Sequence, residues 1–211
     1  MRRESLVSFR TRATLWRDGH LTELPTLSGT DYNAAFDIND DSVIVGQSGD
    51  RAVAWIDDQL IDLHACLDRD YFLSEANAVN AKRQVAGRAI SADLQHVVVW
   101  EFARHGYGDV EVTCSVIHSG SWLLVRDIND HGEIVGMVNW RAFLAEFDEH
   151  GEATTHDLND LISPHSPWLL REAHAVNNRG HIVGTGLPGG FATRGYLLRP
   201  VDGTPNSLRS R

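Results

Sequence analysis

The sequence predicts an all-β protein built as a small β-propeller of four-stranded antiparallel blades. Three observations point to this fold: a ten-residue pattern recurs four times, apolar residues alternate with polar ones, and short turns containing Gly or Asp separate the apolar segments. Units of about 45 residues with four short strands are typical of propeller blades. With 211 residues, the chain is long enough for one domain with a hydrophobic core.

The recurring pattern is a hairpin, and its first copy reads DINDDSVIVG at 37–46. Each copy has Ile or Val, then Asn, four variable residues, two apolar or small residues, and Gly. Asn tolerates left-handed backbone and caps turns with its side chain, so the pattern indicates two strands joined by a tight turn. The conserved positions within the chain are Asn39, Asn80, Asn129 and Asn177, each followed seven residues later by Gly46, Gly87, Gly136 and Gly184.

The first copy also has the alternating oxygen ligands of a calcium loop, at Asp37, Asn39 and Asp41. A calcium loop of about twelve residues needs a carboxylate at its end. Ser48 stands there, and two of the other copies have Ala in place of Asp37. The pattern therefore favours a hairpin over a metal site.

A second hairpin follows each of the first ones, with aromatic and β-branched residues typical of strands. These hairpins occupy 13–24, 51–63, 96–112 and 141–158, with one further strand at 194–200. Each full unit therefore has four strands. The N-terminal unit lacks its first strand, and the last strand of the C-terminal unit is undecided. A short helical turn fits the residues 157–162.

We expect a single domain, 1–211, that consists of one β-propeller. Its repeats lie at about 5–24, 33–63, 74–118, 123–158 and 172–200. Five blades are predicted, and the alternative is four blades with the N-terminal strands completing the last one. In both arrangements the termini meet and close the ring, which protects strand edges.

Composition and charge limit the partners of the protein. The net charge of −10 argues against nucleic acid and anionic membranes. No apolar run approaches the length of about 20 residues that spans a bilayer, and no apolar stretch follows the two N-terminal arginines, so we expect no secretory signal and a cytoplasmic location. The two cysteines, Cys66 and Cys114, are then expected as reduced thiols rather than as a disulfide.

The segments VRDINDHGEIVG and RAFL, and the whole of 156–200, resemble the HAF repeat proteins, a bacterial family named for an extracellular repeat. The resemblance covers roughly 13–200. It implies a repetitive propeller-like fold and brings no shared catalytic motif. We expect the protein to differ from the family in having no secretory signal and no C-terminal sorting tail, and its second full repeat, NAKRQVAG, lacks the turn glycine.

The connections between strands alternate between the two faces of a propeller, and those on one face are longer here. They are 25–33, 64–74, 88–95, 159–171 and 185–194. Long, varied loops on a rigid scaffold commonly carry function. We therefore expect a pocket on this face, around the central channel.

Ionisable and aromatic residues near these loops are the candidate site. The expected catalytic residues are His165, Glu172, Glu75 and His174, and the expected substrate-binding residues are Tyr32, Asp31, His64, Tyr71, Arg88, Trp168, Arg171 and Arg194. His and carboxylate side chains supply acid–base catalysis, while aromatic rings and arginines hold planar or anionic groups. Glu75 and Glu172 occupy matching repeat positions, so a structural role in the repeat is the alternative for both.

The preferred functional interpretation is a cofactor-independent enzyme, a cyclase, isomerase or lyase that acts on a small molecule at the channel mouth. The alternative is a non-catalytic protein-interaction or ligand-binding module. A carbohydrate-binding protein is a third class, which the differences between the loops disfavour. No metal or cofactor is expected, because metal-ligand spacings, phosphate loops and dinucleotide fingerprints are missing from the sequence. The expected partners are a small-molecule ligand and a second copy of the chain that completes the ring.

Overall fold

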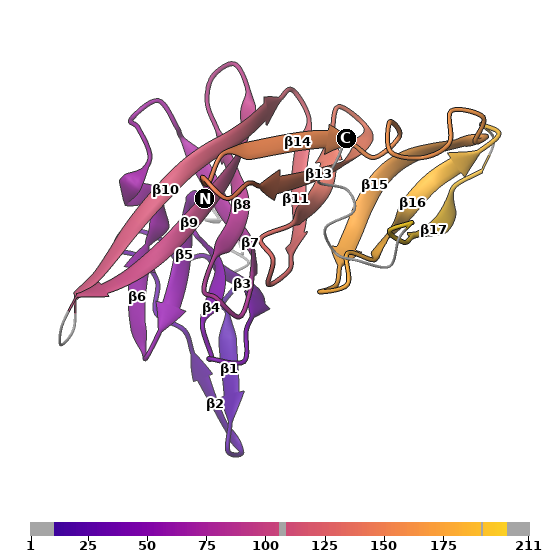
Figure 1. Ribbon diagram of the computed structural model, residues 1–211. Coiled ribbons are helices and arrows are strands. Elements are labelled where there is room, and N and C mark those ends of the chain that lie inside the picture. The colour runs from indigo at the N-terminus through magenta and orange to yellow at the C-terminus, as the bar shows by residue number, and fades with distance from the viewer. Residues whose placement is uncertain (1–10, 106–108, 191, 202–211) are drawn as a thin grey trace, which may run out of the picture.

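The protein is all-β, as a computed structural model that describes residues 11–105, 109–190 and 192–201 shows. In this part of the chain, 17 strands form five antiparallel sheets, and one 3-10 helix is present. Figure 1 shows that the sheets follow one another in the order of the sequence. The hairpins expected from the repeated pattern are confirmed, and the number of sheets equals the number of predicted repeats.

Each sheet is a meander of strands that are consecutive in the chain. The first contains β1 (Thr14–Arg17) and β2 (His20–Glu23). The second contains β3 (Asn33–Ile38), β4 (Ile44–Ser48), β5 (Arg51–Ile56) and β6 (Gln59–Asp62), and the helix η1 (Leu63–Cys66) follows it. The third contains β7 (Leu73–Val79), β8 (Val85–Ile90), β9 (Gln95–His105) and β10 (Asp109–Gly120). The fourth contains β11 (Leu123–Ile128), β12 (Ile134–Val138), β13 (Arg141–Phe147) and β14 (Ala153–Asp157). The fifth contains β15 (Trp168–Val176), β16 (Ile182–Pro188) and β17 (Arg194–Leu198).

The asparagine of each repeat links its own turn to the next repeat. The side-chain amide of Asn39 donates a hydrogen bond to the backbone oxygen of Asn80 at 2.9 Å, and Asn80 and Asn129 bond in the same way to Asn129 and Asn177 at 3.0 and 2.9 Å. The side-chain oxygen of each asparagine accepts from backbone N–H groups of its own turn. The repeated Asn is therefore a rung of a hydrogen-bonded ladder that joins four hairpins.

The repeated glycine lies where the first strand of each hairpin has a β-bulge. A Cβ atom on Gly46 would lie 2.0 Å from the carbonyl oxygen of Ala34, and one on Gly136 would lie 2.0 Å from that of Leu124. No side chain tolerates such an approach, so the close packing of backbone across the bulge requires glycine.

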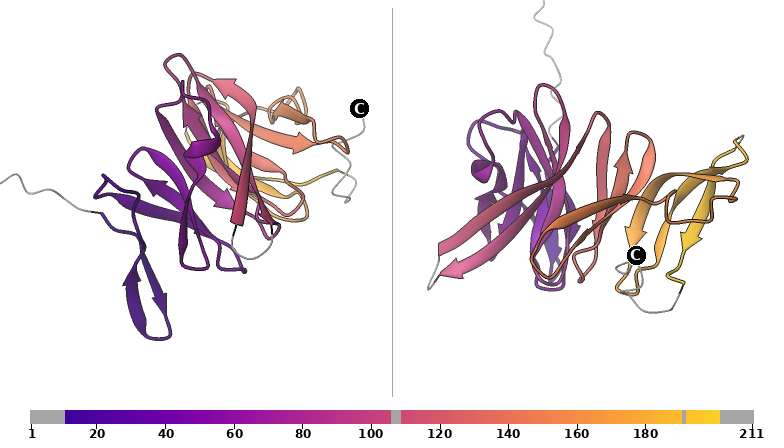
Figure 2. Two further views of the ribbon diagram at one scale, coloured as in Figure 1. Left: turned by 90° about the vertical axis from the view of Figure 1, so that its left-hand side faces the viewer. Right: turned by 45° about the horizontal axis from the view of Figure 1, so that its top comes forward.

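The sheets pack face to face, and each interface has its own hydrophobic core. Alanines and valines of β4 and β5 pack on β7–β9, β8 and β9 pack on β11–β13, and β12 and β13 pack on β15 and β16. Ala13 and Leu24, which flank β1 and β2, cover Trp55 on the second sheet. We call the face of a sheet that meets the preceding sheet its leading face, and the opposite face its trailing face. Figure 2 shows the resulting row of sheets.

Three further sequence predictions concern the N-terminal unit, the ring and the segment 157–162. The part of the N-terminal unit expected before the hairpin at 13–24 lies mostly outside the described residues, and closure of a propeller ring stays a prediction. The one 3-10 helix of the described part is η1, and the turn expected at 157–162 is present, with the N–H groups of Asp160 and Leu161 donating to the backbone oxygens of Asp157 and Leu158. There, Asp157 and Asn159 form a side-chain-capped turn, whereas Asp62 caps η1 by accepting from the N–H of His64.

The expectation that both cysteines are reduced thiols is wrong in this structure. Cys66, at the end of η1, and Cys114, on β10, form a disulfide with a Cα–Cα distance of 6.2 Å. The two residues are 48 positions apart in the sequence and meet because η1 packs against the outer part of the third sheet. Their spacing in the sequence carried no sign of this contact.

Candidate functional site

The long connections gather on one face of the molecule, as the sequence predicts, although some are shorter than expected. The long-loop face, toward the top of Figure 1, carries the connections 24–32, 63–72 and 158–167. Arg88 lies within β8 rather than in a loop, which leaves 91–94 as the connection to β9. The hairpin tips 39–43 and 57–58 lie at the opposite face.

The expected carboxylate candidates form ion pairs within the scaffold. Glu75 on β7 accepts two hydrogen bonds from Arg88, at 2.7 and 3.1 Å. Glu172 on β15 accepts from Arg126 of the neighbouring sheet at 2.6 Å. His174 lies with its Nδ1 atom 3.6 Å from Oε1 of Glu172. The structure therefore brings Glu172 and His174 together, while Glu75 is paired in the third sheet.

The remaining catalytic candidate is separate from these groups. His165 lies in the exposed loop before β15, where its backbone N–H donates to the hydroxyl of Ser163 at 3.3 Å. Its position in this loop differs from the strand positions of Glu172 and His174.

The expected binding residues are spread over the long-loop face in several local contacts. Asp31 forms a 3.4 Å ion pair with Arg12, and Tyr32 follows it with an exposed ring. The ring of Trp168 meets that of Tyr196 edge to face, and Arg194 is exposed at the start of β17. Asp31 and Tyr32 lie in the connection before β3, whereas Trp168 and Arg194 belong to the fifth sheet.

His64 and Tyr71 belong to a polar cluster beside η1. The Nδ1 atom of His64 is 2.7 Å from the hydroxyl of Ser74, and Tyr71 contacts the ring of His96 edge to face at 5.1 Å. Burial, together with the charge of Arg51, lowers the pKa of His64, and burial lowers the pKa of His96. Both imidazoles are therefore biased toward the neutral form and serve as hydrogen-bonding groups of the fold.

An aromatic cluster on the same face was missed by the sequence analysis, except for Arg171. Trp122 and Trp140 are 58% and 49% exposed, and their ring centroids are 5.7 Å apart at an angle of 36°. The guanidinium carbon of Arg171 lies 5.5 Å from the ring centroid of Trp140. We call Trp122, Trp140 and Arg171 the aromatic platform.

Two tight connections hold the tryptophans of the platform. Asn139 and Trp140 form the turn between β12 and β13, with φ values of 50° and 64°. The side-chain oxygen of Asn139 accepts from the N–H of Ser121 at 3.1 Å, and its backbone N–H donates to the oxygen of Trp122 at 2.7 Å. Two-residue hairpin turns of this type favour Gly at the second position. A tryptophan is unusual at this position. It was the one feature of the sequence that could have indicated the aromatic platform.

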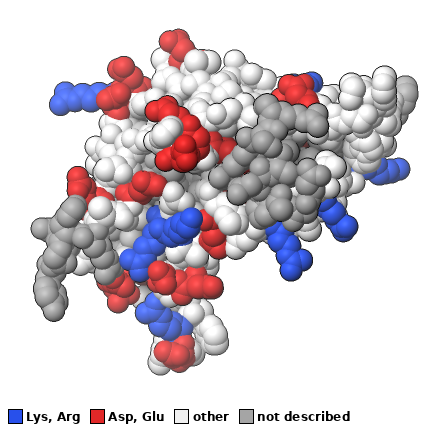
Figure 3. Space-filling model, viewed as in Figure 1, with Lys and Arg blue, Asp and Glu red and all other residues white. Residues whose placement is uncertain are grey.

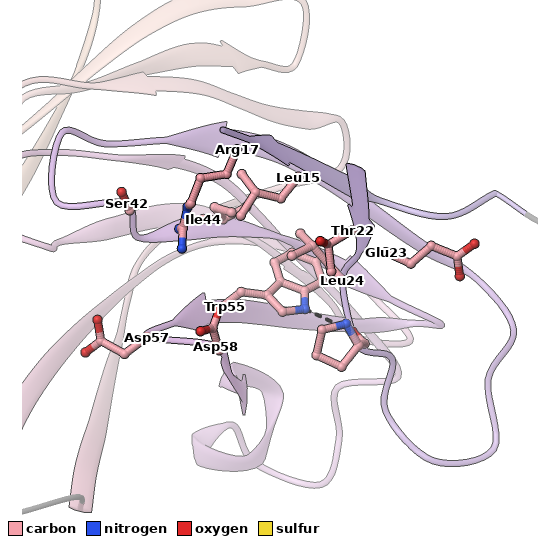
Figure 4. A pocket seen from close by; sticks show the side chains of 11 residues that line it. Leu15, Arg17, Thr22, Glu23, Leu24, Ser42, Ile44, Trp55, Asp57 and Asp58 are labelled. Carbon is pink, nitrogen blue, oxygen red and sulfur yellow. Dashed lines mark hydrogen bonds between the residues drawn. The ribbon is translucent and has the colours of Figure 1, made fainter. Parts of the chain in front are cut away.

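A cavity lies elsewhere, between the first and second sheets. It has a volume of about 600 Å³, with apolar walls from Leu15, Leu24, Ile44 and Trp55. Figure 4 shows Arg17, Asp57 and Asp58 at its margin and the indole of Trp55 bonded to the backbone oxygen of Pro25. The first sheet has two strands in the described part, so it covers only part of its neighbour, and the cavity results from this incomplete cover.

Charge and metal-binding groups provide no competing site in the described part. Figure 3 shows acidic side chains scattered over one face, several of them beside basic ones. Within 11–105, 109–190 and 192–201, no three His, Cys, Asp or Glu side chains are grouped as metal ligands. The same residues contain no helix with the length and apolar character needed to cross a membrane.

Searches against protein-family models, curated protein sequences and solved structures found no match to this chain.

Proposed function

We propose that this protein is a non-catalytic protein-interaction module that docks its partner on the aromatic platform of the long-loop face. The observation that carries the proposal is the exposed pair Trp122–Trp140 with Arg171 stacked beside it. Tryptophan and arginine are the residues most enriched among those that dominate binding energy at protein interfaces. Two exposed tryptophans with a half-buried arginine beside them form a surface of the kind that such interfaces use.

The arginine defines the chemistry of the partner. In the described part of the chain, no side chain or carbonyl accepts a hydrogen bond from the Arg171 guanidinium, which is held by its contact with Trp140. A guanidinium fixed in this way keeps its N–H groups for a carboxylate, which it binds in bidentate geometry. We therefore expect the partner to present a carboxylate beside an aromatic or aliphatic side chain.

The rigidity of the platform supports binding. Trp140 keeps a positive φ because strands β12 and β13 and the bonds of Asn139 determine the turn. Backbone strain of this kind is concentrated at functional sites. A preformed aromatic surface also loses little conformational entropy when a partner binds.

The module is preferred to the enzyme that the sequence analysis favours. The observation behind the enzyme is the contact between Glu172 and His174. Glu172, however, is held by Arg126, and Glu75 is held by Arg88, so both carboxylates already have partners in the scaffold. Acid–base catalysis by these residues remains a second, separate proposal.

The scaffold of the module is an arc of propeller blades. This proposal rests on the four-strand meanders, on their face-to-face packing and on the asparagine ladder, together with the resemblance to HAF repeats. A row of equivalent blades presents its loops on one face, and this arrangement places the platform residues of two neighbouring sheets side by side.

A selection from phage-displayed random peptides tests the proposed interaction. We expect the wild-type protein to enrich peptides with Asp or Glu next to an aromatic or aliphatic residue. The Trp140→Ala variant should bind these peptides roughly 30-fold more weakly, as expected for loss of a dominant interface residue. Arg171→Gln should weaken binding and remove the preference for the acidic residue.

Trp16→Ala is the matched control, because Trp16 is an exposed tryptophan on the distant β1–β2 hairpin. It should leave peptide affinity unchanged. Equal binding of the selected peptides by the wild type and by a Trp122→Ala, Trp140→Ala double variant would overturn the proposal.

A further inference from the structure

We propose that the protein associates head to tail with a second copy of itself, through the exposed sheet faces at the two ends of the row. The head is the leading face of the first sheet, with Trp16 and Leu21. The tail is the trailing face of the fifth sheet, with Leu197 and Val183. The proposal does not depend on the aromatic platform.

The head carries a residue that the repeat normally buries. Trp16 precedes the tip of its hairpin by two residues, as Trp55 does on β5, and both tryptophans point to the leading face. Trp55 is 3% exposed and the corresponding Trp100 is fully buried, each covered by the preceding sheet. Trp16 is 70% exposed, and its cross-strand neighbour Leu21 is exposed beside it.

The tail shows the complementary situation. Leu197 pairs with Val183 across β16 and β17, as Leu144 pairs with Val135 across β12 and β13. Leu144 is 1% exposed, because the fifth sheet covers it, whereas Leu197 is 49% exposed. No described residue takes the place of a following sheet.

The internal interfaces indicate what fits these faces. In the described part of the chain, equivalent positions on the third strand of a sheet face the same way at successive interfaces: Trp55, Trp100 and Ala145 face the preceding sheet, and Ala54, Val99 and Leu144 face the following one. At the second interface, Trp100 of a leading face packs against Ala52 and Ala54 of a trailing face. The head of one copy and the tail of another are the same two kinds of surface, so their union repeats a contact that the chain already makes.

The asparagine ladder has the same polarity. Asn39, Asn80 and Asn129 each donate to the following repeat. At the tail, the side-chain amide of Asn177 has no acceptor among the described residues, while its oxygen caps the turn like the others. In the part of the chain that the structure describes, the tail therefore lacks both the apolar contact and the asparagine hydrogen bond that the other repeats make with the repeat that follows them.

Head-to-tail contact is heterologous, so it leads to a closed ring of copies or to an open chain of them. Sedimentation equilibrium of the wild-type protein over a wide concentration range should show a reversible increase in mass. Trp16→Arg and Leu197→Arg should each weaken self-association roughly tenfold or more, because each places a charge in the apolar contact.

Mixing the two variants tests the direction of the contact. Trp16→Arg keeps an intact tail and Leu197→Arg an intact head, so an equimolar mixture should form a heterodimer and stop there. Val116→Arg is the matched control, since Val116 is an exposed strand residue on β10, away from both ends, and this variant should associate like the wild type. Circular dichroism should confirm that all three variants fold.

Three outcomes would overturn the proposal. A wild-type protein that stays monomeric at every concentration would show that the ends are closed within one chain. Self-association that survives in Trp16→Arg would indicate tail-to-tail contact. Variants that are monomeric both alone and when mixed would indicate that the two substituted surfaces do not meet each other.

Discussion

Asn129 combines two tasks that a turn residue usually does not combine. Its side-chain oxygen accepts from the N–H groups of His131 and Glu133, which fixes the turn, and its side-chain amide donates to Asn177 in the next repeat. The residue is 4% exposed. Removing the side chain would leave buried backbone groups without partners on both sides of a sheet interface, which is the costly case for hydrogen bonds.

Asn129→Ala should therefore lower the free energy of unfolding by about 2–3 kcal/mol. Asn177→Ala is the comparison, because Asn177 caps its own turn but is exposed and bonds no further repeat in the described part. It should cost about 1 kcal/mol, the usual value for a lost cap. Urea denaturation of the two variants and the wild type measures the difference. Equal losses would show that the ladder bond adds nothing to the cap.

At the scale of the elements, η1 is tied to the third sheet by apolar and covalent contacts. Its Leu63 is fully buried, and the backbone oxygen of Leu63 accepts from the indole of Trp100 at 2.9 Å. The Cys66–Cys114 disulfide joins the end of the helix to β10. These contacts hold the segment 63–72, which joins the second sheet to the third, against the third sheet. The polar cluster of His64 and Tyr71 lies in the same segment.

The disulfide closes a stretch of 48 residues, and chain-entropy reasoning assigns such a loop a stabilisation of about 4 kcal/mol. We expect Cys114→Ser to lower the free energy of unfolding by about this amount. A reductant should lower the stability of the wild-type protein and leave that of the variant unchanged. Thiol titration under denaturing conditions, with and without prior reduction, measures the bond directly. Two free thiols in the untreated protein would contradict the prediction.

Residue patterns in the sequence predict most of the strands, but neither η1 nor the contacts between the sheets. Alternating apolar residues and the Asn and Gly of each hairpin determine strands locally. For this reason the hairpins β3–β4 and β11–β12 were predicted at their correct positions in the sequence. Cys66 and Cys114 meet only through the packing of η1, and Trp122 meets Trp140 only because two separate turns lie side by side. Such distances depend on how sheets pack, which a single sequence does not specify.

At the scale of the whole molecule, the sheets differ in how many of their faces are covered. Among the described residues, the third and fourth sheets contribute to hydrophobic cores on both faces, whereas the fifth does so on its leading face alone. In a linear array of repeats, stability is close to a sum of the units and of their neighbouring interfaces. The ends of the row should therefore open more readily than its middle.

Amide hydrogen exchange tests this gradient on two equivalent strands, β12 in the fourth sheet and β16 in the fifth. The amides of β12 should exchange more slowly than those of β16, because local opening of the last sheet breaks one interface only. The measurement is best made with Trp16→Arg at low concentration, which removes self-association and leaves both compared sheets unaltered. Equal protection of the two strands would show that the molecule opens as one cooperative unit.

The order of the sheets along the chain also affects how the protein is made. Every sheet is built from strands that are consecutive in the sequence, and the described cores form between consecutive sheets. A ribosome releases a chain from its N-terminus, and units near that end fold first. Each new sheet can therefore pack on one that is already folded. Its trailing apolar face stays exposed to solvent only until the next repeat has been synthesised.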